Sequence, residues 1–334
     1  MSEQKPEAQV SPVHAKTRTL PGYLGVSARG VCMGVADVIP GVSGGTMALI
    51  LGIYDELIAS VRAFDLHALK LFFSGRFRQF AQYTNLSFLL FLATGIFTAI
   101  LSLAKVIPQL LVNYPKQVNG LFFGLILASI FLVWKQVNST RIPTLSLAAL
   151  GAVAAFLLVG LSRGTTPTHP AIIFLCGAIA IIAMILPGIS GSFLLLIMGK
   201  YSFILSTLNT VRQQRALDQH LMILVVFAAG CAVGLLLFSR VLHWLLEHYH
   251  TQTLALLTGL MIGSLRRIWP FQTYVYETIG HKSRVVSYNN VLPAGSSSDF
   301  LAVGLVAVGF LVVLAMHFFA NPSTSSTQET ATQE

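Results

Sequence analysis

The chain has 334 residues, of which 54% are hydrophobic and only 10% are charged, and its formal net charge is +9. Several uncharged stretches are long enough to cross a bilayer as a helix, which takes about 20 residues. This composition excludes a soluble globular domain and indicates a polytopic membrane protein. The basic residues lie near the ends of the apolar segments, where anionic lipid headgroups would meet them, so we expect no nucleic-acid partner.

Residues 1–21 mix both signs of charge with prolines and lack an apolar core, which predicts a disordered tail and no cleavable signal peptide. The apolar region that follows, 22–62, is too long for one crossing. Its centre reads ADVIPGVSGGTMALILGIYDEL (36–57), where a proline and several glycines interrupt the helical pattern. Each half falls short of a hydrocarbon core of about 30 Å, so we predict a re-entrant helical hairpin that enters and leaves by the same face.

A second broken region, 170–210, carries a similar break in ILPGISGSFLLLIMGKY. Residues 64–83 alternate aromatic and basic side chains, which predicts an amphipathic helix on the membrane surface, either collecting anionic lipid or serving as a structural cuff. The loop 269–299 has strand-like alternation and no assigned role, and residues 320–334 form a second predicted disordered tail. The six plain spans that we predict are 86–107, 117–134, 143–161, 220–242, 252–268 and 300–319.

The two broken regions match each other. At an offset of 147, PGVSGGTMALILGIY (40–54) and PGISGSFLLLIMGKY (187–201) are identical at eight of 15 positions, and the match resumes downstream at an offset of 135. Each repeat therefore holds one hairpin and three spans, and because three is odd the second copy must be inverted. We predict an all-α integral membrane protein with inverted repeats, 22–161 and 162–319. The distribution of lysine and arginine mildly favours an alternative, in which each broken region crosses fully and eight crossings form parallel repeats.

The break has a physical purpose. Proline ends the incoming helix, and glycine allows a tight reversal inside the protein. The outgoing helix then begins at membrane depth with a serine cap and free N–H groups, and such an N-terminus favours an anion. Phosphate is the natural candidate for two opposed N-termini lined with hydroxyls. We assign to these tips Ser43, Gly44, Gly45, Thr46, Ser190, Gly191 and Ser192.

The stretch GVADVIPGVSGGTMALILGIYDEL, with its echo ILPGISGSFLLLIMGKY, resembles the PopT-type polyprenyl-phosphate transporters, over roughly residues 22–319. The resemblance implies a lipid substrate with a phosphate headgroup, undecaprenyl phosphate, returned across the bacterial cytoplasmic membrane for cell-envelope synthesis. It implies no enzymatic activity and no cofactor.

Two alternatives are a small-anion carrier and an enzyme similar to undecaprenyl-pyrophosphate phosphatases, which carry a PGxSRSG hairpin motif. Here Gly44 and Gly191 stand in place of the arginine, which removes the strongest phosphate clamp.

The acidic residues of the first hairpin are candidates for ion coupling. Asp37 is costly at membrane depth unless it is paired or protonatable, and its counterpart in the second hairpin is Met184. We predict that Asp37 is a proton or sodium site, with an internal ion pair to Arg29 as the alternative. Glu56 closes the first hairpin, and its alternative role is that of a solvated interfacial residue.

Three basic residues are candidates for drawing phosphate into the protein. Arg29 precedes the first break, while Lys105 and Arg240 occupy matching positions near the ends of their spans. The alternative for each is snorkelling or anchoring at the interface. The histidines between 243 and 250 lack the spacing of a metalloprotease site, so we expect no bound metal.

Overall fold

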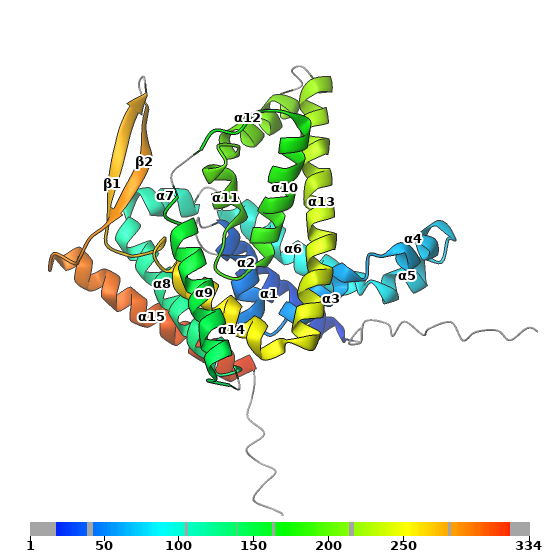
Figure 1. Cartoon of the computed structure of the whole chain (residues 1–334), viewed down its shortest axis with the longest axis horizontal. Coiled ribbons are helices and arrows are strands. Elements are labelled where there is room, and N and C mark those ends of the chain that lie inside the picture. Colours follow the sequence, from blue (N-terminus) through cyan, green and yellow to red (C-terminus); the bar gives the residue numbers. More distant parts are fainter. Residues whose placement is uncertain are drawn as a thin grey trace, which may run out of the picture.

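A computed structural model describes residues 18–38, 43–103, 106–137, 139–161, 164–213, 217–279 and 282–320. Most of this chain is helical, as a bilayer demands, because a helix satisfies its backbone hydrogen bonds internally. The predicted tails, the Pro40–Gly41 break and Lys105 lie wholly or mostly outside the described residues. The two broken regions meet near the centre of the molecule, where α2 packs against α10 (Figure 1).

The first broken region contains three helices, α1 (Leu20–Val38), α2 (Gly44–Ile50) and α3 (Tyr54–Arg62). We predicted one break in this region from the sequence, whereas the structure has two. A second break follows α2, where Gly52 adopts a positive φ of 66° and α3 turns away by 118°. The seven residues of α2 rise only about 10 Å, so the outgoing half is a short helix followed by a sharp turn.

The second broken region repeats this plan. It contains α10 (Pro170–Ile185), α11 (Gly191–Ile197) and α12 (Tyr201–Arg212). Gly199 has a φ of 69°, and α11 and α12 meet at 105°. The matched glycines thus place matched turns in both regions.

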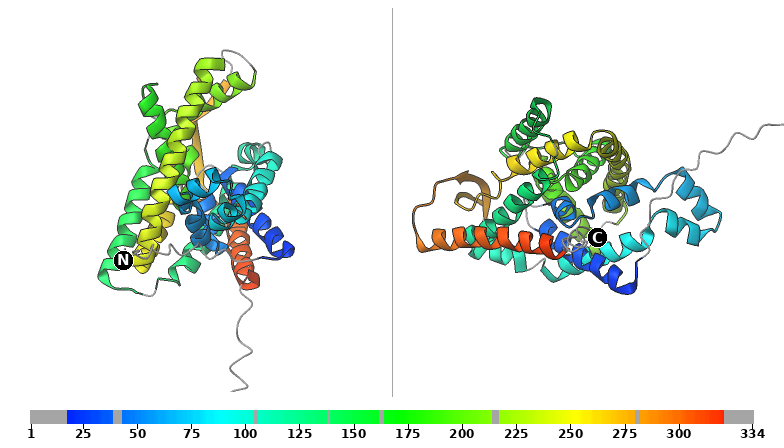
Figure 2. Two further views of the ribbon diagram at one scale, coloured as in Figure 1. Left: turned by 90° about the vertical axis from the view of Figure 1, so that its right-hand side faces the viewer. Right: turned by 90° about the horizontal axis from the view of Figure 1, so that it is seen from below.

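The expected amphipathic helix is a pair of short helices, α4 (Leu66–Phe73) and α5 (Phe77–Tyr83), which project from one side of the molecule (Figures 1 and 2). Asp65 caps α4 by accepting from the Ala68 N–H at 2.8 Å, and it also accepts from the Tyr83 hydroxyl at 2.8 Å. Burial and this hydrogen bond raise the pKa of Tyr83 to about 12. The continuous helix fails because Gly75, with a φ of 71°, turns the chain between the two pieces.

The remaining helices correspond to the predicted spans, with one addition. The span predicted at 86–107 ends at residue 103, and the separate helix α7 follows it. Among the described helices α6, α8, α13 and α15 are long and apolar enough to cross a membrane, whereas α9 and α14 have 17 and 15 residues. Their bounds are α6 (Leu86–Leu103), α7 (Val106–Asn113), α8 (Pro115–Trp134), α9 (Ile142–Leu158), α13 (Leu217–His248), α14 (His250–Ser264) and α15 (Ser297–Ala320).

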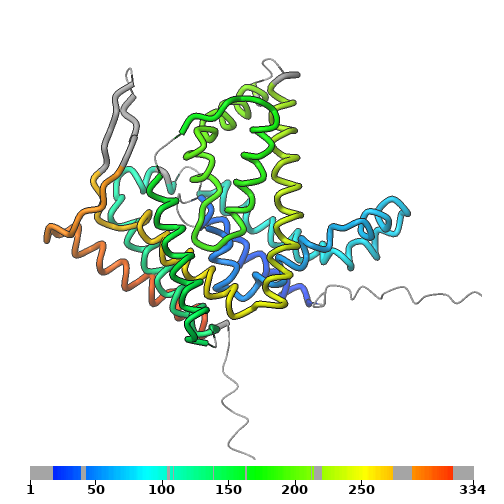
Figure 3. Tube along the Cα trace, in the orientation of Figure 1, coloured from blue at the N-terminus to red at the C-terminus, as the bar shows by residue number. Residues whose placement is uncertain are grey.

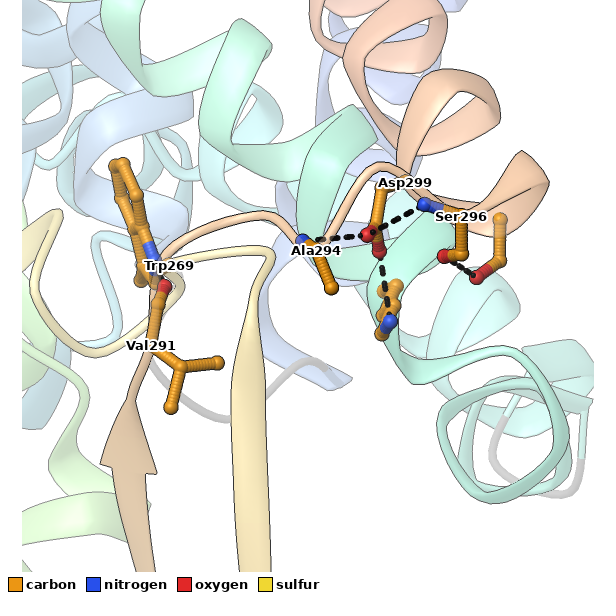
Figure 4. A network of polar contacts seen from close by, with 7 residues as sticks. Trp269, Val291, Ala294, Ser296 and Asp299 are labelled. Atoms are coloured by element: carbon orange, nitrogen blue, oxygen red, sulfur yellow. Dashed lines mark hydrogen bonds and ion pairs between the residues drawn. The ribbon is translucent and has the colours of Figure 1, made fainter.

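The loop 269–299 contains the antiparallel strands β1 (Gln272–Ile279) and β2 (Lys282–Asn290), so the all-α prediction needs one correction. The alternation and the β-branched and aromatic residues of QTYVYETI explain the strand. The hairpin is followed by a linker without regular secondary structure, residues 291–296, which leads to α15. Trp269 donates to the Val291 carbonyl at one end of this linker, and Asp299 accepts from the Ala294 and Ser296 amides at the other (Figure 4).

Four helix pairs pack along their lengths: α1 with α6, α10 with α13, α8 with α15 and α9 with α14 (Figure 3). Each pair brings a glycine of one helix onto a backbone carbonyl of the other, so closely that any side chain would overlap it. The contacts are Gly95 on Ser27, Gly230 on Phe174, Gly124 on Val306 and Gly259 on Ala148.

Candidate functional site

The two broken regions are joined by hydrogen bonds. The Ser43 hydroxyl donates to the carbonyls of Met184 and Leu186, each at 3.2 Å. The Thr46 hydroxyl accepts from the Gly188 N–H at 2.9 Å. Met184 lies in the last turn of α10, and Leu186 and Gly188 lie in the break between α10 and α11. The start of α2 therefore satisfies backbone groups that have no helical partners at this break.

Tyr54 adds a further contact at the same place, since its buried hydroxyl donates to the Ile185 carbonyl at 3.2 Å. Gly45 presses against that carbonyl so closely that a side chain would overlap it. Ser43, Thr46 and Tyr54 are each no more than 2% exposed. The tip of the first hairpin, Ser43 to Thr46, is therefore buried against the break in the second hairpin.

The first tip also holds a carboxylate. Ser43 caps α2 as predicted, by accepting from the Gly45 N–H at 3.1 Å, and Asp37 Oδ1 accepts from the Gly44 N–H at 2.8 Å. A Cβ at Gly44 would lie 2.5 Å from Asp37 Oδ2, so only glycine admits the carboxylate. The N-terminus that was predicted to receive an anion is thus occupied by the protein's own side chain, a favourable charge placement.

The second tip differs in three ways. Met184 takes the place of Asp37, and no described carboxylate caps α11. Ser190 makes no capping hydrogen bond, and its hydroxyl lies 2.9 Å from that of Ser192. Gly191 packs against the Ala180 carbonyl. The hydroxyls at this tip bond only to each other in the described chain, and Ser192 is half-buried.

A cation that the sequence interpretation missed, Arg267, lies beside the second hairpin tip. The Cζ atom of Arg267 lies 5.4 Å from the ring centroid of Phe193, which is in the first turn of α11, and 4.2 Å from the ring centroid of Tyr288. The Nε atom of Arg267 is buried without a hydrogen-bond partner in the described chain. The signal was the pair Arg266–Arg267 at the end of the predicted span 252–268, which is hard to distinguish from an interfacial anchor.

The structure does not bring to the hairpin tips the basic residues that we predicted to contact phosphate. Arg240 donates to the carbonyls of Leu236 at 2.7 Å and Phe64 at 3.2 Å, and so fixes α13 to the segment after α3. Arg29 is half-buried on α1 and makes no hydrogen bond or ion pair within the described residues. The alternative pairing of Asp37 with Arg29 is not among the described ion pairs. Lys105 lies outside the described residues.

Glu56 takes part in a bidentate ion pair. Arg18 Nη1 and Nη2 lie 2.6 Å from the two carboxylate oxygens of Glu56, and the Asn85 amide donates to Oε1 at 2.9 Å. Both charged side chains are 14% exposed. The hydrogen bond to Glu56 raises the pKa of Arg18. This geometry favours a structural role, which ties the start of α1 to α3 and α6.

A buried cation, Lys200, also escaped the sequence interpretation. It is 3% exposed at the second break of its hairpin, and its ammonium donates to the Thr166 carbonyl at 2.7 Å and lies 5.0 Å from the Phe203 ring. Its counterpart in the first hairpin is the apolar Ile53. No group of three potential metal ligands occurs among the described residues.

Two mutually bonded breaks among the described apolar helices, four of which are long enough to cross a bilayer, define a multi-pass membrane protein. Residues 33–286 match the model of the VCA0040-like family, described as undecaprenyl phosphate translocase-like, and the chain belongs to this family. The family is one of transporters and not of enzymes.

Two curated relatives cover most of the chain, and both are described as polyprenyl-phosphate transporters. One, from Vibrio cholerae, is 43% identical over 308 residues, 89% of this chain and 97% of the relative. The other, from Staphylococcus aureus, is 31% identical over 254 residues, 72% of this chain and 84% of the relative. No solved structure matches the chain.

Proposed function

We propose that this protein carries polyprenyl phosphate, in particular undecaprenyl phosphate, across the bacterial cytoplasmic membrane for cell-envelope synthesis. The headgroup passes the hairpin tips while the isoprenoid tail stays in lipid. The observation that carries the proposal is the meeting of the two breaks, where Thr46 bonds Gly188, in a chain 43% identical to a polyprenyl-phosphate transporter. Irregular backbone at membrane depth is tolerated where it is buried in protein or lines a polar path.

We propose further that the chain consists of two inverted repeats, 22–161 and 162–319. Equivalent helices make equivalent contacts, which supports this. Gly95 meets the Ser27 carbonyl just as Gly230 meets that of Phe174, at the offsets of 135 and 147 found in the sequence. The partners of α8 and α9 are exchanged between the repeats, since α8 packs on α15 and α9 on α14. Such repeats are a transporter architecture.

The second tip is the proposed contact for the headgroup. Ser190, Gly191 and Ser192 offer hydroxyl and N–H donors without a competing carboxylate, and Arg267 supplies charge nearby. A guanidinium suits phosphate because its donors are arranged in a planar fork. The first tip, Ser43 to Thr46, contributes its donors only after its bonds to the second break open.

Asp37 is the proposed coupling site. Its carboxylate and a phosphate compete for the same N–H group of Gly44, so an anionic substrate reaches the first tip only when Asp37 leaves or loses its charge. Protonation, or binding of a sodium ion, would neutralise the carboxylate. The competition thereby links the ion gradient to substrate movement.

Transport into proteoliposomes of labelled undecaprenyl phosphate, with and without proton or sodium gradients, tests the proposal. We expect gradient-dependent movement, and Asp37→Asn should abolish the dependence because an amide keeps the shape but cannot change its charge. Asp55→Asn, which alters an exposed carboxylate at the start of α3, is the matched control and should keep the dependence. Absence of lipid movement, or phosphate release from undecaprenyl pyrophosphate, would contradict the proposed function.

A further inference from the structure

A cavity of about 410 Å³ lies away from the hairpin tips, at the C-terminal end of α14. Its walls come from α8, α9, α14 and the linker after β2, and they are mainly apolar, with Phe123, Phe156, Ile262 and Trp269 contributing large side chains. Cavities of this size are typical of small-ligand sites. The tryptophan and the neighbouring arginines are typical of the level of lipid headgroups.

One charged group, Arg266, faces this cavity. Its Nη1 donates to the Phe156 carbonyl at 3.0 Å, and its guanidinium lies 4.3 Å from the Phe156 ring. Gly160 allows this position, because a Cβ there would come 2.5 Å from Nη1. Within the described residues no carboxylate pairs with Arg266, and its Nε and Nη2 groups make no hydrogen bond. The cavity therefore offers positive charge and unused donors among apolar walls.

The outer wall is held in place at both ends. The Val291 carbonyl accepts from the Trp269 indole at 2.9 Å, and the Val291 N–H donates to the Phe271 carbonyl at 2.9 Å. The linker leads into the first turn of α15, where Asp299 lies 2.7 Å from Lys116 (Figure 4). Leu292 on this wall is 83% exposed and Ile262 is 42% exposed. The cavity is thus open to the surroundings past apolar side chains, as a long lipid chain requires.

Arg266 and Arg267 are consecutive but face different places. Arg266 lines the lateral cavity, while Arg267 lies over Phe193 beside the second tip. The backbone of α14 also touches the second break, since a Cβ at Gly188 would come 2.8 Å from the Cα of Met261. The end of α14 therefore connects the cavity with the proposed headgroup path.

We infer that this cavity is a lateral docking site for a phosphorylated isoprenoid lipid, with Arg266 binding the phosphate and the aromatic and aliphatic walls holding the first isoprene units. The inference rests on the proposed function and extends it to a loading step. The occupant follows from charge and shape. An uncharged lipid would leave the guanidinium donors unused, and inorganic phosphate would leave the apolar walls uncovered.

Trp269 provides a local reporter, because the chain has three tryptophans and Trp134→Phe with Trp244→Phe leaves it alone. The full-length protein in detergent is titrated with farnesyl phosphate, farnesol and inorganic phosphate while Trp269 emission is recorded. We expect a saturable change with farnesyl phosphate, and a Kd at least about 10-fold weaker for the other two, because a hydrogen bond to a charged group contributes that much.

Arg266→Gln should weaken farnesyl phosphate binding by about 10- to 100-fold. Lys135→Gln, which removes an exposed positive charge at the end of α8, is the matched control and should leave the Kd unchanged. If Arg266→Gln does not fold, Arg266→Lys keeps the charge but loses the fork, and a weaker Kd is again expected.

Equal binding of farnesol, an unchanged Kd in the Arg266 variants, or no response of Trp269 would overturn the inference. Transport by the same single-tryptophan protein separates the two proposals. Transport without a response of Trp269 rejects the docking site alone. A specific response without any transport supports the docking site and rejects the proposed function.

Discussion

The contact between Asp37 and Gly44 allows a quantitative test of the first tip. Gly44→Ala introduces a Cβ that lies 2.5 Å from Asp37 Oδ2 and 2.8 Å from Oδ1, so the carboxylate must move away from the start of α2. The loss of a charged hydrogen bond costs about 1.5 to 3 kcal/mol. Alanine returns about 0.4 to 1 kcal/mol by restricting the unfolded chain. We expect a net loss of about 1 to 2 kcal/mol in the free energy of unfolding.

Reversible unfolding in mixed detergent and SDS micelles measures this loss. Gly304→Ala is the matched control, because no atom of the described residues lies within 4 Å of a Cβ at that helical glycine, and it should be neutral or slightly stabilising. In an Asp37→Ala background there is no carboxylate for the new Cβ to overlap. Gly44→Ala should therefore lower the free energy of unfolding by at least about 1 kcal/mol less there than in the natural protein. Equal costs in the two backgrounds would refute a carboxylate seated on Gly44.

Three further predictions concern the rest of the chain. Glu56→Gln removes half of the pair with Arg18 and should lower the free energy of unfolding by about 1 to 3 kcal/mol while transport keeps its gradient dependence; a lost dependence would make Glu56 a coupling residue. Asp65→Ala removes the cap of α4, which costs about 1 kcal/mol, and should return the pKa of Tyr83 from about 12 toward 10, read as the phenolate absorbance that Tyr83→Phe removes. In the natural protein this raised pKa contributes stability that is present below about pH 10 and lost as the pH rises through 12. If the first broken region is re-entrant, a cysteine at position 70 should be labelled from the same side as one at position 2, and labelling from the opposite side would support eight crossings.

Local rules predicted the local features of the site. Ser43 caps α2 because a serine before a glycine-rich helix start is a strong capping signal, and the break positions followed from proline and glycine. The turn at Gly52 was encoded as well, since the matched Gly199 makes the same turn. We interpreted that glycine only as part of a repeat, and so predicted one break where there are two.

Such local rules could not predict contacts that depend on how distant segments pack together. The bond between Thr46 and Gly188 joins residues 142 positions apart, and no periodicity indicates it. Asp37 lies near the end of α1 and Gly44 begins α2, so their hydrogen bond depends on how the two helices meet. Arg267 was missed because its position at the end of a predicted span is equally typical of an interfacial anchor, and only its stacking on Phe193 distinguishes the two roles.

The glycine contacts between helices have a mechanical consequence. Where the backbones of two helices are in contact, no side chain can change its rotamer to accommodate a shift of one helix along the other. We therefore expect each helix pair to move as a rigid unit. The pairs α8–α15 and α9–α14 each combine helices from both proposed repeats, so neither repeat can rotate against the other without separating them. These four helices form a fixed frame. We therefore expect motion during transport in the two remaining groups, α1 to α3 with α6 and α10 to α12 with α13, which hold the two hairpin tips.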